Sequence, residues 1–449
     1  MPALWSRIYI RPDCERPANL SYYPRNTISK RVLPFVRRVD LAAYAGWLEG
    51  EQEAEVKENF ERHLGYMSGC LRVLRELKST LHSMSLYFTF YDPNNYPADW
   101  RGTINEINDV ALHILERVSK MKFRHFEFNL DEDSPRVEEI FSIIGPKVDK
   151  LRFRPLPVSG EVASPLRHFE RLKSISLGPS ERRDPPGEEP LWNSLSQLPT
   201  LQRAQITNIP LSLQDDFQLP QLIHLRLSLW WSIGPEEWAR SLVAVFKQMS
   251  GLESLVVERK PNTQTRSETE TMQISTVACV NLRELTLDCP QPKGLVSTIA
   301  KRCAQLTRCF LNDKYNIGDE DIRQLSQSCP NLRELRLRYA ECITTGLEYL
   351  AALHQLEVLE LSYTMGKYLL KPVLLNFAKE CPKLEKVVVS DWQTYTARSL
   401  GIRPFEETPL EGLFPAAVEL PSYFEPNISI NVPYHPDGLD EYEVRIDKL

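Results

Sequence analysis

The sequence predicts an α/β fold in which short parallel strands, each followed by a helix, stack side by side. Three observations lead to this fold class. An apolar pattern of the form Leu-x-x-Leu-x-Leu recurs along the chain. Its copies between residues 123 and 389 begin about 26 residues apart on average, and the intervening segments carry apolar residues three and four positions apart. One strand and one helix at this period are typical of a leucine-rich repeat. We therefore expect a solenoid of horseshoe form, with a concave parallel sheet and outer helices.

The copies of this pattern mark the expected strands. Alternate side chains of a strand face the same side, so the second and third apolar residues of each copy should point into the core. Leu285, Leu335 and Leu359 should therefore occupy equivalent inward positions, and the residues between the apolar ones should lie on the open face. The copies begin at Trp5, Val36, Leu81, Phe123, Val148, Leu172, Leu201, Leu222, Leu252, Leu282, Leu306, Leu332, Leu356 and Leu384.

The segments between the copies are expected to form helices. One of them offers Ser134 as a cap followed by Pro135, and another begins with acidic residues that suit a helix N-terminus. The helices are expected within residues 133–146, 234–249, 318–330 and 371–382.

A medium-sized apolar residue ends each helical stripe, and Pro often follows it because Pro terminates a helix. This slot holds Cys279, Cys303, Cys329 and Cys381 in four repeats, and Leu or Met in others. A position that accepts Leu or Met in place of Cys requires packing rather than a reactive thiolate.

The repeat around Cys329 is similar to the cysteine-containing, ribonuclease-inhibitor-like leucine-rich repeat of F-box/LRR proteins. The likeness rests on Cys329-Pro-Asn-Leu, the apolar pattern after it, and Cys342 followed by Ile-Thr. It is close over residues 279–390 and looser upstream. The N-terminal "MPALWSRIYI" also resembles the segment that follows an F-box. The resemblance implies a substrate-recognition module of an SCF-type ubiquitin ligase, which acts in ubiquitin-dependent protein degradation.

The F-box itself is expected to be missing from this chain. It would precede the N-terminal segment, but Met1 lies where it should end, and no Leu-Pro-x-Glu-type opening occurs in the sequence. Two interpretations remain open. An upstream exon could supply the F-box, which makes the chain a substrate receptor, or the chain is a stand-alone interaction scaffold with no ligase role.

The predicted organisation has three parts. Residues 1–35 supply the first strand, residues 36–392 the repeats, and residues 393–449 a Pro-rich cap or tail for the last repeat. Polar, Pro-containing insertions that we expect to be exposed loops lie near residues 92–102, 178–190 and 258–271.

The composition of the chain and the absence of known site motifs limit the classes of function that we expect. The chain of 449 residues has a net charge of −6, which does not favour a nucleic-acid partner. It has no apolar run long enough to span a bilayer, so we expect no membrane association. Nine cysteines without close pairing suggest reduced thiols in the cytoplasm or nucleus. No Cys-x-x-Cys, His-x-x-x-His, Walker or Gly-x-Gly-x-x-Gly motif occurs. We therefore expect a protein-binding module with no catalytic, metal or cofactor site.

The open-face positions of the later repeats are the candidate binding residues. We hypothesise that they contact an acidic or phosphorylated segment of a protein partner, because Arg pairs well with carboxylate and phosphate. The alternative is a solvated face balanced by Glu334 and Glu360. The candidates are Arg308, Phe310, Arg336, Arg338, Glu360 and Lys386.

Two further groups are candidates on other grounds. Trp230 and Trp231 follow a strand and could anchor a partner, or pack against the solenoid. A separate basic group in earlier repeats contains Lys150, Arg152, Arg154 and Arg203.

Overall fold

The structure is a computed structural model, and it divides into two compact units, Met1–Phe217 and Gln218–Leu449. We call them unit 1 and unit 2. The described residues are 7–10, 37–43, 53–77, 81–130, 136–153, 165–178, 194–207, 219–229, 242, 245–259, 279–289, 293–312, 317–338, 345–362, 380–390, 428–431 and 441–446.

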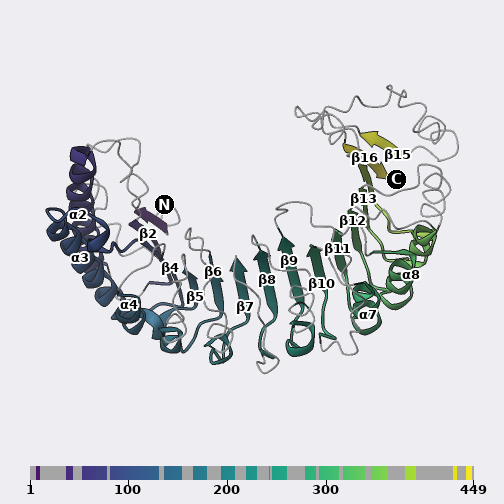
Figure 1. The fold of residues 1–449 in the computed structure, drawn as a ribbon, viewed down its shortest axis with the longest axis horizontal. Coiled ribbons are helices and arrows are strands. Elements are labelled where there is room, and N and C mark those ends of the chain that lie inside the picture. The colour runs from purple at the N-terminus through teal and green to yellow at the C-terminus, as the bar shows by residue number, and fades with distance from the viewer. Residues whose placement is uncertain are drawn as a thin grey trace. The chain divides into compact units, whose positions relative to one another are not determined.

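The described strands of unit 1 form a parallel sheet in which each strand pairs with its neighbour in the sequence (Figure 1). Every strand begins within three residues of the start of an apolar copy, as the repeat predicts. The strands are β1 (Arg7–Ile10), β2 (Arg38–Ala43), β3 (Ser83–Phe88), β4 (His125–Leu130), β5 (Lys150–Phe153), β6 (Ser174–Leu177) and β7 (Arg203–Thr207).

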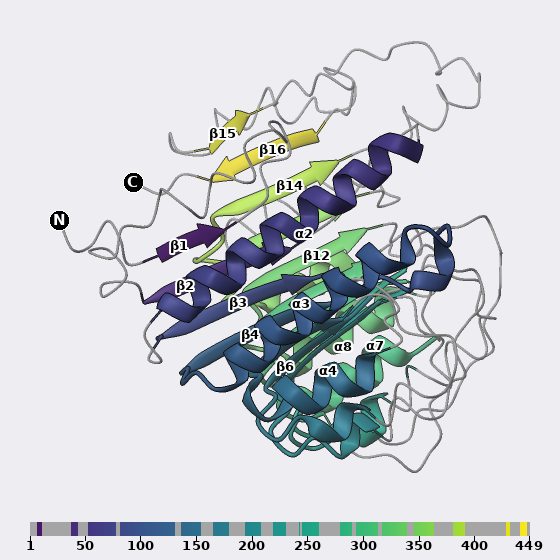
Figure 2. The same cartoon turned by 90° about the vertical axis from the view of Figure 1, so that its left-hand side faces the viewer.

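Helices cover one face of this sheet (Figure 2). The helix α3 illustrates why, since Ile104, Ile107, Ala111 and Leu115 recur at helical spacing and are buried. We call the side of each unit's sheet away from its described helices the open face. The helical elements of unit 1 are α2 (Glu53–Glu76), η4 (Pro93–Asn95), α3 (Arg101–Ser119), α4 (Val137–Ile144), η5 (Gly145–Lys147) and η7 (Pro165–His168).

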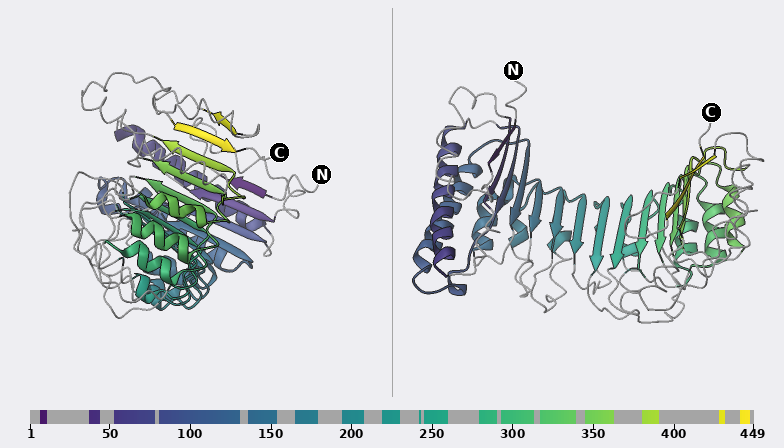
Figure 3. Two further views of the ribbon diagram at one scale, coloured as in Figure 1. Left: turned by 90° about the vertical axis from the view of Figure 1, so that its right-hand side faces the viewer. Right: turned by 90° about the horizontal axis from the view of Figure 1, so that it is seen from above.

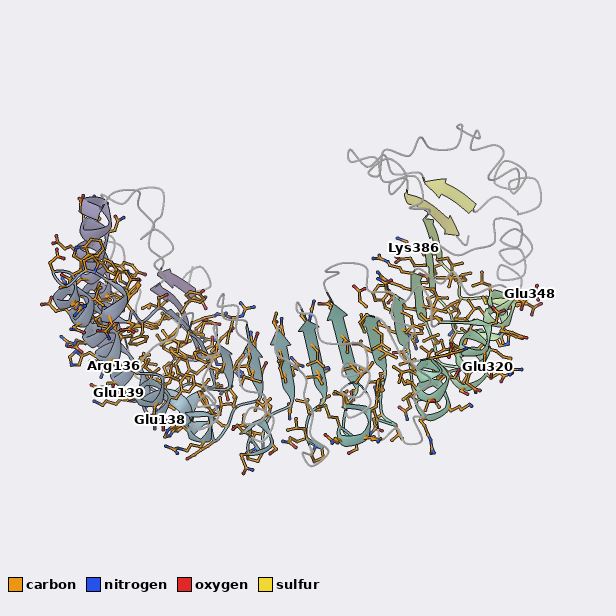
Figure 4. The ribbon with its side chains drawn as sticks, in the orientation of Figure 1. Arg136, Glu138, Glu139, Glu320, Glu348 and Lys386 are labelled. Carbon is orange, nitrogen blue, oxygen red and sulfur yellow. The ribbon has the colours of Figure 1, made fainter. Side chains whose placement is uncertain are left out.

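On the helix side, ion pairs connect neighbouring repeats of unit 1. Figure 4 shows Arg136, Glu138 and Glu139 there, at the first turn of α4. Glu138 lies 2.6 Å from Arg167 and 2.8 Å from His168, both in η7. The hydrogen bond from His168 is the main cause that lowers the pKa of Glu138. The proposed cap Ser134 lies outside the described residues.

Residues 92–102, which the sequence predicts to be an exposed loop, are partly buried. Trp100 is only 6 % exposed, because it packs in an apolar cluster with Phe60 and Tyr91. The side chain of Asn108 fixes the backbone of Tyr91, the residue just before this segment. That side chain accepts the backbone N–H of Tyr91 at 3.1 Å and donates to the Tyr91 carbonyl at 2.8 Å. The aromatic residues therefore place this segment more strongly than its polar residues do.

One register in unit 1 departs from the repeat alignment. The alignment pairs Phe126 with Leu151, whereas Phe128 lies opposite Leu151 in the structure. This displacement of two residues keeps every side chain on its own face. At this displacement, the largely buried carboxylate of Asp149 bonds to the neighbouring strand and to an arginine. Oδ2 accepts the backbone N–H of Phe126 at 3.0 Å, and Oδ1 accepts Nε–H of Arg171 at 3.0 Å.

This arrangement predicts that Asp149→Ala destabilises unit 1 by roughly 1–3 kcal/mol, because a buried backbone N–H loses its acceptor. Urea-induced unfolding measures the change. The control Asp109→Ala removes an exposed ion pair with Arg136 in the same unit and should cost about 1 kcal/mol or less. Equal effects of the two substitutions would contradict the role assigned to Asp149.

Unit 2 continues the pattern with strands that pair in sequence order from β8 to β14. Helices again lie on one face (Figure 3, green helices). The elements are β8 (His224–Leu229), β9 (Ser254–Arg259), β10 (Glu284–Asp288), α7 (Leu295–Arg302), β11 (Arg308–Asn312), α8 (Asp319–Ser328), β12 (Glu334–Arg338), η8 (Gly346–Ala352), β13 (Val358–Ser362), β14 (Lys386–Ser390), β15 (Ile428–Asn431) and β16 (Glu441–Ile446).

The inward positions of unit 2 are equivalent from strand to strand. Leu285 lies opposite Cys309, Cys309 opposite Leu335, and Leu335 opposite Leu359. All four side chains are buried. These registers confirm the predicted leucine-rich-repeat solenoid, in which parallel strands form the sheet and helices cover one side.

The cysteines at the helix ends form a second inter-repeat contact. Cys303 Sγ donates to the carbonyl of Cys279 at 3.1 Å, and Cys279 Sγ donates to the carbonyl of Met249 at 3.0 Å. Each of these two thiols thus bonds to the backbone carbonyl of the residue at the equivalent position of the preceding repeat. Burial raises the pKa of Cys279, Cys303 and Cys329 to about 12, so these thiols stay protonated. The structure supports the packing interpretation and adds a weak hydrogen bond to it.

Acidic side chains at the start of α8 connect three repeats. The Asp321 carboxylate accepts the backbone N–H of Gly318 at 3.1 Å and that of Ser297 in α7 at 3.0 Å. Asp319 accepts the N–H of Gly346 at the start of η8, at 2.7 Å. The acidic residues therefore accept backbone N–H groups at the N-termini of neighbouring helices as well as at the N-terminus of their own helix.

The C-terminal tail adds two strands to the sheet of unit 2 (Figure 3, yellow strands). β16 pairs antiparallel with β14, and β15 pairs antiparallel with β16. The tail thereby covers the hydrogen-bonding edge of the last repeat strand, which would otherwise be exposed.

Within the predicted helix segment 371–382, the described residues are 380–382; within 234–249, they are 242 and 245–249.

Candidate interaction surface

Side chains from successive strands form rows across the open face of unit 2. The parallel registers place one residue of each strand beside the equivalent residue of the next, so residues about one repeat apart in the sequence become neighbours. The first row contains Ser254, Glu284, Arg308, Glu334, Val358 and Lys386; the second Val256, Thr286, Phe310, Arg336 and Glu360; the third Glu258, Asp288, Asn312 and Arg338.

Arg308 is the most exposed arginine of these rows, with 62 % of its side chain accessible. It lies 2.8 Å from Glu284 on the preceding strand and 3.7 Å from Glu334 on the following strand. Ser254 donates a further hydrogen bond to Glu284 at 3.2 Å. The Arg308 guanidinium is therefore held between carboxylates and remains accessible to solvent.

Arg336 and Arg338 share the carboxylate of Glu360, which is 13 % exposed. Arg338 donates to it at 2.7 Å, and Arg336 lies 3.4 Å away. Arg336 also donates through Nε to Glu334 at 2.7 Å. Exposed pairs of this kind each stabilise a protein by only about 0.2–1 kcal/mol, so the network orients the arginines more than it stabilises the unit.

Phe310 supplies an aromatic surface within this network. The guanidinium carbon of Arg338 lies 5.2 Å from the centre of the Phe310 ring, which is a cation–π contact. Beside it, Asn312 donates to the carboxylate of Asp288. Burial raises the pKa of Asp288, while that hydrogen bond and the charge of Arg338 act in the opposite direction.

These residues surround a cavity of about 380 Å³. Its lining combines an aromatic ring, guanidinium groups, carboxylates and a hydroxyl, which can contact both apolar and polar parts of a polypeptide. The lining residues are Val256, Glu284, Leu285, Thr286, Arg308, Cys309, Phe310, Glu334, Arg336 and Arg338. Of the predicted candidates, Arg308, Phe310, Arg336 and Arg338 therefore line one site.

The other candidates lie elsewhere or outside the described residues. Glu360 is beside the cavity and orients two of its arginines. Lys386 follows Val358 in the first row, and Figure 4 shows it on the strand side of unit 2, whereas Glu320 and Glu348 lie on the helix side. Trp230, Trp231 and Arg154 lie outside the described residues.

Sequence reasoning missed Glu284, Thr286 and Val256, which complete the cavity. The same alternation that identified Phe310 also identifies these residues on β9 and β10. The alternation that predicts open-face positions therefore also marked these residues, one and two repeats before Phe310.

Other site types find no support in the described residues. No group of three or more His, Cys, Asp or Glu side chains in this part of the chain is placed to hold a metal ion. None of the described helices has the length and apolar character that crossing a membrane requires. The described cysteines are free and buried.

Comparisons with known proteins include two solved structures to which this chain is similar. No protein-family model matches the chain, and no curated protein matches it. The crystal structure of the yeast Rad7 and Elc1 complex is 14 % identical over 77 % of this chain and 83 % of that chain, with a TM-score of 0.34. The Drosophila Toll–Spatzle complex is 12 % identical over 75 % of this chain and 51 % of that chain, with a TM-score of 0.36. The assignment of the repeat fold rests on the strand registers above.

Proposed function

We propose that this chain is a non-enzymatic, protein-binding leucine-rich-repeat module that binds through the open face of β9–β13. The observation that carries this proposal is the cavity of about 380 Å³ lined by Phe310 and three ordered arginines. Aromatic and Arg side chains are the residues that contribute most often to binding energy at protein interfaces. The ion pairs hold these side chains in place before binding, which lowers the entropy cost of association.

The chemistry of the cavity favours a partner segment with a carboxylate or phosphate group. Such a group would take over donors that Arg308 and Arg336 now share with Glu334. A planar guanidinium can serve two acceptors, so Glu334 keeps the Nε–H of Arg336 and Glu360 keeps the donors of Arg338. Phe310 would contact an apolar neighbour of the acidic residue.

Double substitution of Arg336 and Arg338 tests this proposal. We expect Arg336→Glu with Arg338→Glu to abolish capture of the partner, and the milder Arg336→Gln with Arg338→Gln to weaken it, because both remove donors from the cavity. The matched control is Arg302→Glu, an exposed position at the end of α7. Partners captured by the wild type are identified by mass spectrometry, and thermal melting verifies folding. Unchanged capture by both folded double variants would remove the proposal.

The resemblance of residues 279–390 to F-box/LRR repeats supports a more specific role. We propose that the module recognises substrates for SCF-type ubiquitination in the cytoplasm or nucleus when an F-box is present in the full-length product. The alternative is an interaction scaffold with no ligase role. Co-purification of the SCF adaptor with the product of the complete reading frame separates them. Recovery of the adaptor supports the first, and its absence at a concentration that retains the partner supports the second.

A further inference from the structure

Basic side chains gather at the start of strands β4–β7 and on the open face of unit 1. The segments 122–128, 147–153, 170–177 and 202–207 together contain eight Lys and Arg residues against three Asp and Glu residues. The equivalent positions of unit 2 carry both signs in near balance, as the network around Arg336 shows. The basic residues are Lys122, Arg124, Lys147, Lys150, Arg152, Arg171, Lys173 and Arg203.

Backbone hydrogen bonds place these segments side by side. The N–H of Asp149 donates to the carbonyl of Phe126, the N–H of Lys173 to that of Asp149, and the N–H of Arg203 to that of Lys173. Within the sheet, Lys150 pairs with Ser174 and Ser174 with Arg203, while Arg152 pairs with Ser176. Residues that are about one repeat apart in sequence therefore form one continuous surface.

The acidic residues neutralise only a minority of these charges. Glu127 lies 2.9 Å from Lys150. Asp149 lies 2.8 Å from Arg171, but its other oxygen is bound to the Phe126 N–H, and the carboxylate is largely buried. Glu170 is exposed at the margin.

Five cations are left exposed without an ion pair to any described residue. They are Lys122, Arg124, Arg152, Lys173 and Arg203, which we call the basic cluster. The nearby positive charges also affect the pKa of the neighbouring Lys147. Its pKa is lowered by burial and, after that, by the charges of Arg171 and Lys122. An anion bound here would relieve this repulsion.

We propose that the basic cluster is a second docking surface and binds a short acidic stretch of a partner polypeptide, through Asp, Glu or phosphorylated side chains. The cluster spans four neighbouring strands, about 15 Å, which matches a handful of extended residues. Ser174 lies beside Arg203 and Ser176 lies beside Arg152, so their hydroxyls add donors for oxygen atoms.

A polypeptide fits this surface better than a nucleic acid does. Single-stranded nucleic acids bind through aromatic side chains on which bases stack, in addition to a basic groove. In the described segments of the cluster, Phe123 is half-buried and stacks on Phe126 with ring centres 5.3 Å apart, and the exposed His125 ring lies edge-to-face with that of His82 at 6.0 Å. Both described rings thus already contact another ring, and the charged groups at this surface outnumber them.

Fluorescence anisotropy with the full chain tests the inference. The probes are labelled peptides of equal length composed of glutamate, of phosphoserine with glycine, or of glutamine, and a short single-stranded DNA. At about 0.1 M salt we expect the two acidic peptides to bind, and binding to weaken as salt is raised, because the attraction is electrostatic. The glutamine peptide should not bind.

Two triple variants give the matched comparison. Lys122→Gln with Arg124→Gln and Lys173→Gln removes three charges from the cluster and should lower affinity for both acidic peptides by about tenfold or more. Arg72→Gln with Arg75→Gln and Arg101→Gln removes three exposed charges from α2 and α3 and should leave affinity unchanged. The first variant's thermal melting curve, compared with that of the second, verifies folding.

The outcomes separate the possibilities. Binding of either acidic peptide that is lost in the cluster variant and kept in the control supports the inference, and the tighter peptide identifies carboxylate or phosphate as the preferred group. Tighter binding of the DNA, or equal binding by both variants, overturns it. The Arg336 and Arg338 variants should retain this binding, so failure here is distinct from failure of the function proposed for unit 2.

Discussion

Leu335→Ala should destabilise unit 2 by roughly 2–5 kcal/mol, because it removes a fully buried side chain from the middle of the repeat stack and leaves a cavity. Leu335 lies between Cys309 and Leu359 on the adjoining strands, so three repeats lose contacts at once. A loss of this size is a large fraction of the stability of a typical domain.

The control for this prediction is the next residue in the chain. Arg336→Ala removes an exposed side chain from the opposite face and should cost about 1 kcal/mol or less. Urea-induced unfolding, combined with hydrogen exchange of the amides in β11–β13, measures both variants. A smaller effect at residue 335 than at 336 would contradict the assignment of inward and outward faces.

Acid should destabilise unit 1 through His63. This side chain is fully buried on α2, with ring centres 6.4 Å from Tyr66 and 6.1 Å from Tyr91, and burial lowers its pKa from 6.5 to about 4. The unfolded chain binds a proton near pH 6.5, whereas the folded chain does so only near pH 4. The stability linked to His63 is therefore complete above pH 6.5 and is lost as the pH falls towards 4.

The expected loss from this one group is about 3 kcal/mol. Free energies of unfolding measured across this pH range, with hydrogen exchange in α2 to localise the change, test it. His63→Phe keeps an aromatic ring of similar size and should flatten the pH dependence of unit 1. The same slope in the variant and the wild type would show that other groups cause the acid effect.

The fold was predictable because its signal is repeated. A strand position such as Leu335 is ambiguous alone, but Leu285 and Leu359 stand at the same place in their own copies, and the parallel register confirms the alignment. The displacement beside Asp149 was not predictable, since a shift of two residues preserves the alternation on which the alignment rests. Burial of Trp100 was missed because the polar residues around it dominate the local composition.

The candidate sites were predictable to different extents. Alternation placed Arg308, Phe310 and Arg336 on one face, and the registers bring them together. Their pairing with Glu284 depends on side-chain geometry that a sequence pattern does not specify. The basic cluster was predictable only in part. Alternation singled out Arg152 and Arg203, whereas Lys122, Arg124 and Lys173 precede their strands in separate repeats and join them only through folding.

Site-specific photocrosslinking tests the central claim, that the open face of unit 2 binds a polypeptide. Benzoylphenylalanine is placed at position 310, inside the cavity, or at position 349, where Tyr349 is 42 % exposed on η8. We predict that one partner polypeptide crosslinks at position 310 and not at position 349. Crosslinking of that partner at position 349 alone would contradict the claim.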